Sequence, residues 1–106
     1  GTPSSARMST REIYDSWNQS TATSKSNAII KHVNKHGEGR TVSEYTRDGN
    51  TFYQNYNGQA RAHNLFNGDV GVKIINRQNN YYGIYDNSGG QISHGAIQKG
   101  SPFSVD

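Results

Sequence analysis

The chain has 106 residues, which is the size of a single domain with one modest core. Its net charge of +3 favours an acidic partner such as nucleic acid or an acidic protein. It contains no cysteine, which excludes disulfides and cysteine-ligated zinc, and no apolar run approaches the roughly 20 residues that span a bilayer. Seven Tyr, three Phe and one Trp supply large packing surfaces, so we expect the chain to fold although only 30% of its residues are hydrophobic.

A helix-capping signal marks the start of the domain. Residues 1–8 read as a linker or a remnant of cloning, and we expect residues 9–106 to be one domain excised from a longer protein. Ser9 and Glu12 have the S-x-x-E spacing of a capping box, in which each side chain satisfies a free backbone amide at the start of a helix. Trp17 follows on the apolar side of this predicted helix, and we expect it to anchor the core.

Two of the four histidines fall in residues 29–40. The segment is predicted to be helical, with an N-cap in residues 24–27 and Gly37 as the C′ residue. Its basic side chains form two i, i+4 pairs on adjacent faces, namely His32 with His36 and Lys31 with Lys35. This spacing places a proton-transfer pair beside a cationic pair able to hold a phosphate, which suits attack on RNA. The alternative is a polar surface helix that carries basic residues without a catalytic role.

Residues 41–56 carry signals for two different structures. Thr41 and Glu44 form a second capping box, and the residues behind it recur with helical spacing. A hairpin that turns at Asp48 and Gly49 is the alternative, because Asp-Gly is a strong hairpin signal and Thr, Tyr and Phe favour strands. We favour the helix.

The rest of the chain predicts a loop and three strands. Residues 57–69 are rich in Gly and Asn and read as a loop. Strands are expected at residues 70–75, 81–85 and 91–97, separated by polar turns, and residues 98–106 are expected to be irregular. The predicted fold is therefore α+β, with N-terminal helices packed on a small antiparallel β-sheet.

Alternation within the predicted strands assigns side chains to two faces of the sheet. On the last strand, His94 shares a face with Ile92, and Ser93 shares the opposite face with Gln91. If the valines of the first strand pack on the helices, Lys73 lies on the open face. Ser93 joins it there if Ile92 faces the helices.

The order of these features resembles a known family. The motifs Lys-His-x-x-x-His-Gly, a capped Thr-x-Ser-Glu-Tyr helix and a hairpin containing Gly-Ile-Tyr-Asp are similar to those of C-terminal toxin domains of bacterial polymorphic and contact-dependent inhibition systems. More narrowly, they resemble ribonucleases of the barnase, EndoU, colicin and RelE superfamily, particularly colicin D-like and barnase-like members. The resemblance covers residues 29–97. It implies an α+β endoribonuclease without a cofactor that cleaves tRNA. Such a domain is secreted or displayed as part of a larger protein, acts in the cytoplasm of a target cell, and is neutralised by a cognate immunity protein, expected to be acidic.

The resemblance also implies roles for individual residues. One helix histidine is a general base or acid, the helix lysines bind phosphate, and the late strand supplies a hydroxyl or aromatic group. The candidate catalytic residues are His32, His36, Lys35, Ser93 and His94. The candidate RNA-binding residues, chosen for charge or for a ring that can stack on a base, are Lys31, Arg40, Lys73 and Tyr85. Arg40 can alternatively cap the end of the second helix.

Metal-free RNA cleavage needs a base for the 2′-hydroxyl, an acid for the leaving 5′ oxygen and cations for the charge on the phosphorane. Histidine suits both proton-transfer roles because its unperturbed pKa is about 6.5. Zinc is an alternative, since histidines at i and i+4 can ligate it, with His63 or His94 as the third ligand. The glutamate of the H-E-x-x-H motif is missing, however, and Lys35 would repel the cation. A non-enzymatic module that binds glycan or protein is the other alternative.

Overall fold

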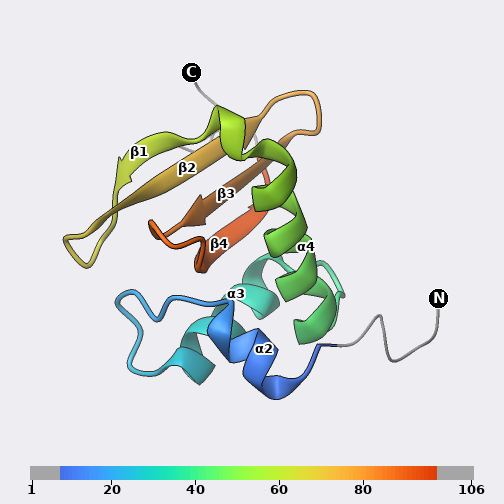
Figure 1. Cartoon of the computed structure of the whole chain (residues 1–106). Coiled ribbons are helices and arrows are strands. Elements are labelled where there is room, and N and C mark those ends of the chain that lie inside the picture. Colours follow the sequence, from blue (N-terminus) through green and yellow to red (C-terminus); the bar gives the residue numbers. More distant parts are fainter. Residues whose placement is uncertain (1–7, 98–106) are drawn as a thin grey trace.

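The computed structural model describes residues 8–97, and within them three α-helices precede a four-stranded sheet (Figure 1). The helices are α2 (Thr10–Asp15), α3 (Lys25–His36) and α4 (Val42–Tyr56), followed by a short 3-10 helix, η1 (Asn57–Gln59). The strands are β1 (Arg61–Asn64), β2 (Val70–Asn76), β3 (Tyr81–Tyr85) and β4 (Gln91–Ala96). The α+β fold is thus confirmed. The expected linker, apart from residue 8, and the expected irregular tail lie outside the described residues.

Both predicted capping boxes are present. The Ser9 hydroxyl accepts from the Glu12 amide at 3.1 Å, and the Glu12 carboxylate accepts from the Ser9 amide at 2.9 Å. Thr41 and Glu44 repeat this exchange at 3.1 and 2.8 Å at the start of α4. The helix predicted over residues 41–56 is therefore confirmed, and the hairpin alternative is wrong.

Gly49 lies inside α4 rather than in a turn, because the helix needs a residue without a side chain there. A Cβ atom at this position would stand 2.7 Å from Cδ2 of His94 and 2.6 Å from Oε1 of Gln91. Glycine costs a helix roughly 1 kcal/mol relative to alanine. Here it allows α4 to lie directly against β4.

The C-terminus of α3 differs slightly from the prediction. Gly37 is the C-cap in right-handed conformation, with φ of −72°, and the chain leaves the helix through left-handed Glu38 and Gly39. Arg40 then turns back to the helix end. Its Nε donates to the Gly37 carbonyl at 2.8 Å and its Nη2 donates to the His36 carbonyl at 3.2 Å. One of the alternatives considered for Arg40, capping of the second helix, is confirmed.

The sheet has the order β1-β2-β3-β4 and is antiparallel throughout. Strands β2, β3 and β4 match the three predicted strands, but β1 lies in the segment expected to be a loop, and that prediction is wrong. β1 is a short, largely exposed edge strand without apolar alternation. Its four residues pair with β2, where Arg61 stands opposite Lys73. Pairing with a neighbouring strand, rather than any local pattern, makes this segment extended.

A β-bulge changes the predicted faces of β4. Ser93 pairs with Ile84, but Gln91 pairs with Tyr85, so Ile92 is an extra residue between the two pairs. As a result, the side chains of Gln91 and His94 both contact α4. The side-chain amide of Gln91 donates to the Thr46 carbonyl at 2.9 Å, and the His94 ring donates to the Tyr45 carbonyl at 2.8 Å. The prediction that Ser93 and Gln91 share one face is therefore wrong.

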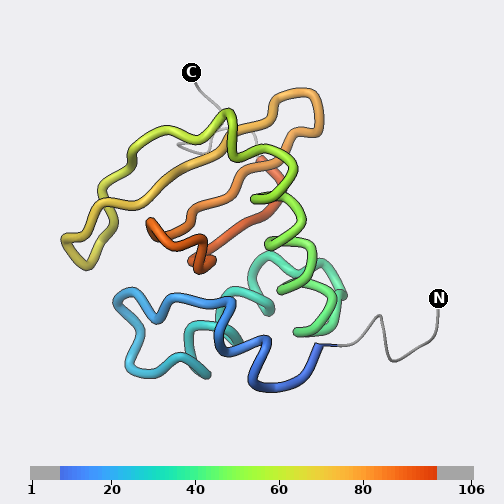
Figure 2. The backbone as a smooth tube through the Cα atoms, in the orientation of Figure 1, coloured from blue at the N-terminus to red at the C-terminus, as the bar shows by residue number. Residues whose placement is uncertain are grey.

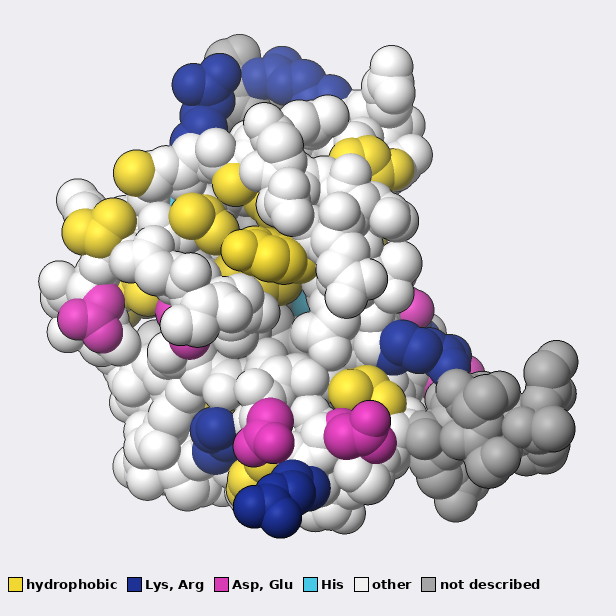
Figure 3. Space-filling view, in the orientation of Figure 1, with side chains coloured by type: hydrophobic (Ala, Val, Ile, Leu, Met, Phe, Trp, Pro, Cys, Tyr) yellow, Lys and Arg dark blue, Asp and Glu magenta, His cyan; other side chains and the backbone are white. Residues whose placement is uncertain are grey.

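The core consists of two clusters of buried side chains along one face of α4, one at Tyr45 and the other two turns later at Phe52. One, Trp17, Ile29 and Tyr45, holds the three helices together, and the other, Phe52, Ile74 and Tyr85, packs α4 on the sheet. Trp17 is 3% exposed, so its predicted role as a core anchor is confirmed. Figure 2 shows the helical part of the chain below the sheet, with α4 running alongside both. In Figure 3, hydrophobic side chains gather over the sheet in the middle of this face. No helix among residues 8–97 is both long and apolar enough to cross a membrane.

Candidate functional site

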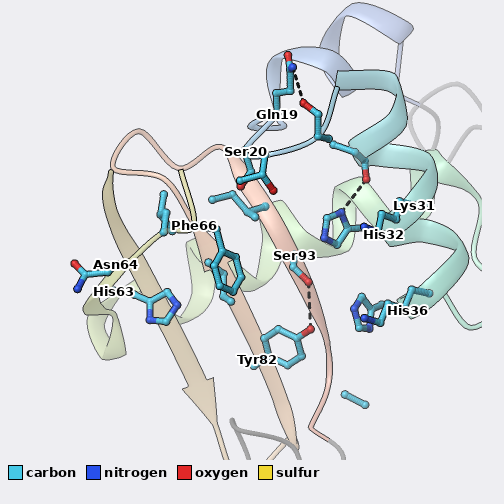
Figure 4. Close-up of a pocket in the computed structure, with 18 residues that line it drawn as sticks. Gln19, Ser20, Lys31, His32, His36, His63, Asn64, Phe66, Tyr82 and Ser93 are labelled. Carbon is cyan, nitrogen blue, oxygen red and sulfur yellow. Dashed lines mark hydrogen bonds between the residues drawn. The ribbon is translucent and has the colours of Figure 1, made fainter. Parts of the chain in front are cut away.

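A cleft of about 720 Å³ lies between α3 and the face of the sheet that α4 does not cover. Its size falls in the range of about 300–1,000 Å³ that is typical of sites for small ligands. One wall is α3 together with residues 19–22, the floor is formed by β3 and β4, and the opposite wall is residues 63–66 (Figure 4). The cleft therefore joins three parts of the chain that are remote in sequence.

The α3 wall carries both histidine and lysine pairs predicted from the sequence. His32, His36, Lys31 and Lys35 all line the cleft, because i, i+4 spacing puts each pair on one side of the helix. The rings of His32 and His36 are nearly parallel, with centroids 6.2 Å apart. The structure thus brings four of the nine candidate site residues together on one helix.

His32 has a defined ring orientation. Its Nδ1 donates to the Ala28 carbonyl at 2.8 Å, one turn earlier in α3, and Trp17 packs against the ring with centroids 5.9 Å apart. In the neutral ring, a protonated Nδ1 leaves Nε2 as the proton acceptor. Burial lowers the pKa of His32 and the charges of Lys31 and Lys35 lower it further, although the hydrogen bond to Ala28 opposes them. His32 is thereby held neutral with a free basic nitrogen.

His36 lies one turn farther along the same wall, against the floor. Its ring meets the Tyr82 ring edge to face, with centroids 6.2 Å apart, and its side chain borders Gly95, where a Cβ would stand 3.3 Å from the His36 Cβ. Burial lowers the pKa of His36, and the neighbouring His32 and Lys35 lower it further. The two histidines are therefore coupled: a charge on one disfavours a charge on the other.

The floor of the cleft presents two hydroxyl groups. Ser93 on β4 and Tyr82 on β3 are hydrogen-bonded to each other at 3.2 Å, and they are 8% and 6% exposed. The predicted relation between Ser93 and Lys73 is confirmed by the register, since Lys73 pairs with Ile84 and Ile84 pairs with Ser93. Ser93 lines the cleft, whereas Lys73 lies farther out on the same face, toward β1.

Sequence reasoning considered His63 as a possible zinc ligand but did not predict the opposite wall, because this wall depends on β1. His63 and Asn64 end this strand, and Leu65 and Phe66 begin the turn to β2. The pKa of His63 is lowered by burial and by the charge of Lys73. The single local signal for this wall was a phenylalanine placed next to an Asn-Gly turn in a polar segment.

The cleft is electrostatically one-sided. Lys31 and Lys35 are its charged lining residues, three histidines join them, and no Asp or Glu of the described chain lines it. An anion that enters the cleft therefore meets favourable charges from α3 without a competing carboxylate. This arrangement suits a phosphate group.

His94, a predicted catalytic residue, lies on the other side of the sheet. It is fully buried and stacks on Tyr45 with centroids 3.8 Å apart. Its Nε2 donates to the Tyr45 carbonyl at 2.8 Å, and its Nδ1 accepts from the Tyr81 hydroxyl at 2.7 Å. Burial lowers its pKa to about 4. With both ring nitrogens occupied, His94 is a neutral core residue that cannot exchange protons with a substrate, and its predicted role requires correction.

Tyr85 and Arg40 also make contacts that stabilise the fold. Tyr85 was expected to stack on RNA, but it is fully buried and its hydroxyl donates to the Gly49 carbonyl at 2.6 Å, so no base can reach its ring. Arg40 pairs with Asp48 at 2.9 Å and lies over the Tyr45 ring, 5.1 Å from its centroid. Because these contacts and the α3 cap occupy its guanidinium, Arg40 does not take part in the cleft.

The zinc alternative required a third ligand near His32 and His36. Among residues 8–97, no group of three or more His, Asp or Glu side chains is arranged so that it could hold a metal ion. His94 is separated from the other two by its place in the core, and His63 stands on the opposite wall.

We compared the chain with models of protein families, with curated proteins and with solved structures, and none of the three comparisons gave a match. A functional interpretation therefore rests on the residues of the cleft and on what they can do chemically.

Proposed function

We propose that this domain is an endoribonuclease that works by acid and base catalysis without a metal ion. The observation that carries the proposal is the orientation of His32: its Nδ1 is bonded to the Ala28 carbonyl, and its basic Nε2 remains available in a cleft lined by cations. His36 stands one turn away, so a second proton-transfer group lies beside the first. Two histidines and two lysines supply the groups that RNA cleavage requires.

In this mechanism His32 is the general base. Its Nε2 removes the proton of a ribose 2′-hydroxyl, and the 2′ oxygen attacks the adjacent phosphorus. The bond between phosphorus and the 5′ oxygen breaks as His36, in its protonated form, gives its proton to that leaving oxygen. The products are a 2′,3′-cyclic phosphate and a free 5′-hydroxyl, so no further reactant is needed.

The lysines and the floor complete the site. Lys31 and Lys35 stabilise the additional negative charge that forms on the phosphate in the transition state. Ser93 and Tyr82 offer hydroxyl groups to the phosphate or ribose from below, where they already share a hydrogen bond. Each of these groups lines the same cleft as the two histidines.

The resemblance to C-terminal toxin domains supports three extensions of this proposal. The substrate is tRNA, the domain is delivered into competing bacteria as part of a larger protein and acts in their cytoplasm, and a cognate immunity protein neutralises it. Because Lys31 and Lys35 give the cleft a positive charge, an acidic immunity protein that covers it would associate rapidly.

The first experiment is incubation of the purified domain with total bacterial RNA in EDTA, followed by a denaturing gel. We expect discrete fragments from the parent protein and none from His32→Ala or His36→Ala. Asn34→Ala is a matched control, since Asn34 is on the exposed side of α3 and does not line the cleft. Thermal unfolding of each variant tests whether the fold is retained.

The alternative functions give different results in the same experiment. Cleavage that requires added divalent metal would replace this mechanism by a metal-dependent one. Intact RNA in every condition, including with added metal and cell extract, would contradict the proposal and favour a module that binds without catalysis.

A further inference from the structure

Phe66 is the most exposed large hydrophobic side chain among residues 8–97, with 97% of its surface accessible. It lies in the turn between β1 and β2 and lines the cleft across from α3. Figure 4 shows its ring projecting toward the space between the two walls, with His32 and His36 on the far side. The ring is therefore accessible to a ligand that enters the cationic cleft.

The turn holds Phe66 in a defined place. The Leu65 amide donates to the Asp69 carbonyl at 2.8 Å, and the Gly68 amide donates to the Leu65 carbonyl at 3.0 Å. Gly68 has φ of +94°, which favours glycine at this point of the turn. Leu65 is only 7% exposed and packs over Gly71, so one residue anchors the turn while the next is presented to solvent.

The surroundings of Phe66 favour a nucleic acid over other partners for an aromatic ring. The α3 wall provides Lys31 and Lys35 for phosphates, and the lining of the cleft contains no carboxylate within the described residues. Asn64, exposed at the end of β1, carries an amide that can both donate to and accept from a base edge. The cleft thus has an aromatic ring on one side, which could contact a base, and two lysines on the other, which could contact the phosphate of the same or the next nucleotide.

We propose that Phe66 stacks on an unpaired base of the RNA while α3 holds the adjacent phosphate, so that the enzyme acts on single-stranded or loop nucleotides. This inference rests on the proposed ribonuclease function and adds its substrate class. The bases of a duplex are stacked on each other and offer no free face, whereas a splayed base can lie on an aromatic ring. Phe66 is thus a specificity-determining residue that touches the substrate but moves no proton.

Binding of a fluorescein-labelled single-stranded RNA tests this in the His32→Ala background, in which the proposed chemistry is removed. Stacking on one aromatic ring corresponds to about a 5- to 140-fold change in dissociation constant. We expect Phe66→Ala to weaken binding by this factor and Phe66→Tyr, which keeps a ring, to bind like its parent. Phe66→Leu keeps an apolar side chain but has no ring, so it should weaken RNA binding about as much as Phe66→Ala does.

Two further ligands distinguish stacking on a base from any other contact that the ring makes with RNA. An RNA of the same length with abasic positions in place of bases should bind equally to Phe66→Ala and to the parent, because the stacking partner is absent. When the original RNA, with all its bases, is paired in a duplex, the affinity of the protein for it should likewise not depend on Phe66. Because Phe66 is exposed, thermal unfolding of all variants should match the parent.

Phe66→Ala binding within about twofold of its parent would overturn the inference, and it is the result expected if this ring serves a protein partner instead. An equal loss on abasic RNA would also overturn it, because the ring would then contact the RNA elsewhere than at a base. The cleavage experiment keeps the two proposals apart. If RNA is cut at the same sites and rates with and without Phe66, the inference fails and the ribonuclease proposal stands. If Phe66 governs RNA binding but no RNA is ever cut, the ribonuclease proposal fails, and only the stacking contact between Phe66 and RNA stands.

Discussion

The Nδ1 atom of His32 lies 2.8 Å from the carbonyl oxygen of Ala28, one turn earlier in the same helix. A carbonyl can only accept, so this bond assigns the proton of the neutral ring to Nδ1 and the lone pair to Nε2. In the proposed mechanism, this bond distinguishes two histidines that the sequence alone left equivalent. It also provides a way to test the base separately from the fold.

Replacement of His32 by asparagine should abolish catalysis while keeping the local hydrogen bond. The asparagine amide can donate to the Ala28 carbonyl as Nδ1 does, but it cannot accept a proton from a 2′-hydroxyl. We expect His32→Asn and His32→Ala to lower the cleavage rate by about 100- to 10,000-fold, the usual contribution of a general base. Single-turnover cleavage of a labelled RNA measures this, and parent-like rates in His32→Asn would contradict the role of base.

The pH dependence of kcat/KM should be bell-shaped, with its maximum below pH 6.5. The base must be neutral and the acid protonated, and the pKa values of His32 and His36 are both lowered, first of all by burial. The rate should therefore rise as His32 loses its proton and fall again, still on the acidic side of neutrality, as His36 loses its own.

His36→Ala provides the control for this profile. Its rate should be lower throughout, and it should lose the decline on the alkaline side, because the acid that titrates there is gone. A rate for the parent that stays constant from pH 7 to pH 9, read from initial velocities at low RNA concentration, would show that His36 is not the acid.

The lysines of α3 should account for a measurable part of the salt dependence of RNA binding. Each phosphate contact with a single strand contributes about 0.7 to the slope of log K against log salt. We expect Lys31→Ala and Lys35→Ala each to reduce the slope by about this amount and to weaken binding. Lys25→Ala is the matched control on the same helix, since its ammonium donates to the Tyr14 carbonyl at 2.8 Å, outside the cleft.

The buried His94 should make the domain less stable in acid. Its pKa falls from 6.5 in the unfolded chain to about 4 in the fold, mainly through burial, so between these values the unfolded state binds an extra proton. Stability is unaffected by this group above pH 6.5 and is lost as the pH falls toward 4. At about 1.4 kcal/mol for each pH unit, the loss reaches about 3 kcal/mol.

His94→Gln tests this, because glutamine can still donate to the Tyr45 carbonyl but does not titrate. Urea unfolding at pH 7 and at pH 4.5 should show a smaller difference in stability for this variant than for the parent. The groups around the ring, Tyr45, Tyr81, Arg40, Asp48 and His36, are unchanged in the comparison. An equal difference in both proteins would assign the acid sensitivity to other titratable groups, among them Glu12 and Glu44, whose pKa values are lowered by their capping hydrogen bonds.

Arg40 should prove to be a structural residue. Arg40→Lys keeps the charge but cannot donate at once to Asp48, to the Gly37 carbonyl and to the His36 carbonyl. We expect a loss of about 1–3 kcal/mol in the free energy of unfolding, the range for hydrogen bonds made by charged groups. The RNA dissociation constant of the folded variant should stay close to that of the parent, and a large increase without loss of stability would restore Arg40 as an RNA-binding residue.

The helices and their contribution to the site could be read from the sequence. Capping boxes at Ser9 and Thr41 act over three residues, and the pairing of His32 with His36 follows from the pitch of a helix, so both are local properties. Alternating side chains likewise marked β2. These signals depend on neighbours within one or two turns of the chain, and the structure confirms them.

Only the tertiary structure decided which of the remaining candidates face the cleft. The extra residue Ile92 in β4 and the packing against Tyr45 place His94 in the core, and pairing with β2 makes an edge strand of residues whose own pattern predicts a loop. Burial and strand register are set by partners that are remote in sequence, as in the bond between Tyr45 and His94, which are 49 residues apart. The local sequence pattern does not show which distant residues will become partners. The sequence therefore predicted one wall of the cleft, α3, whereas the opposite wall with Phe66 became evident only in the folded chain.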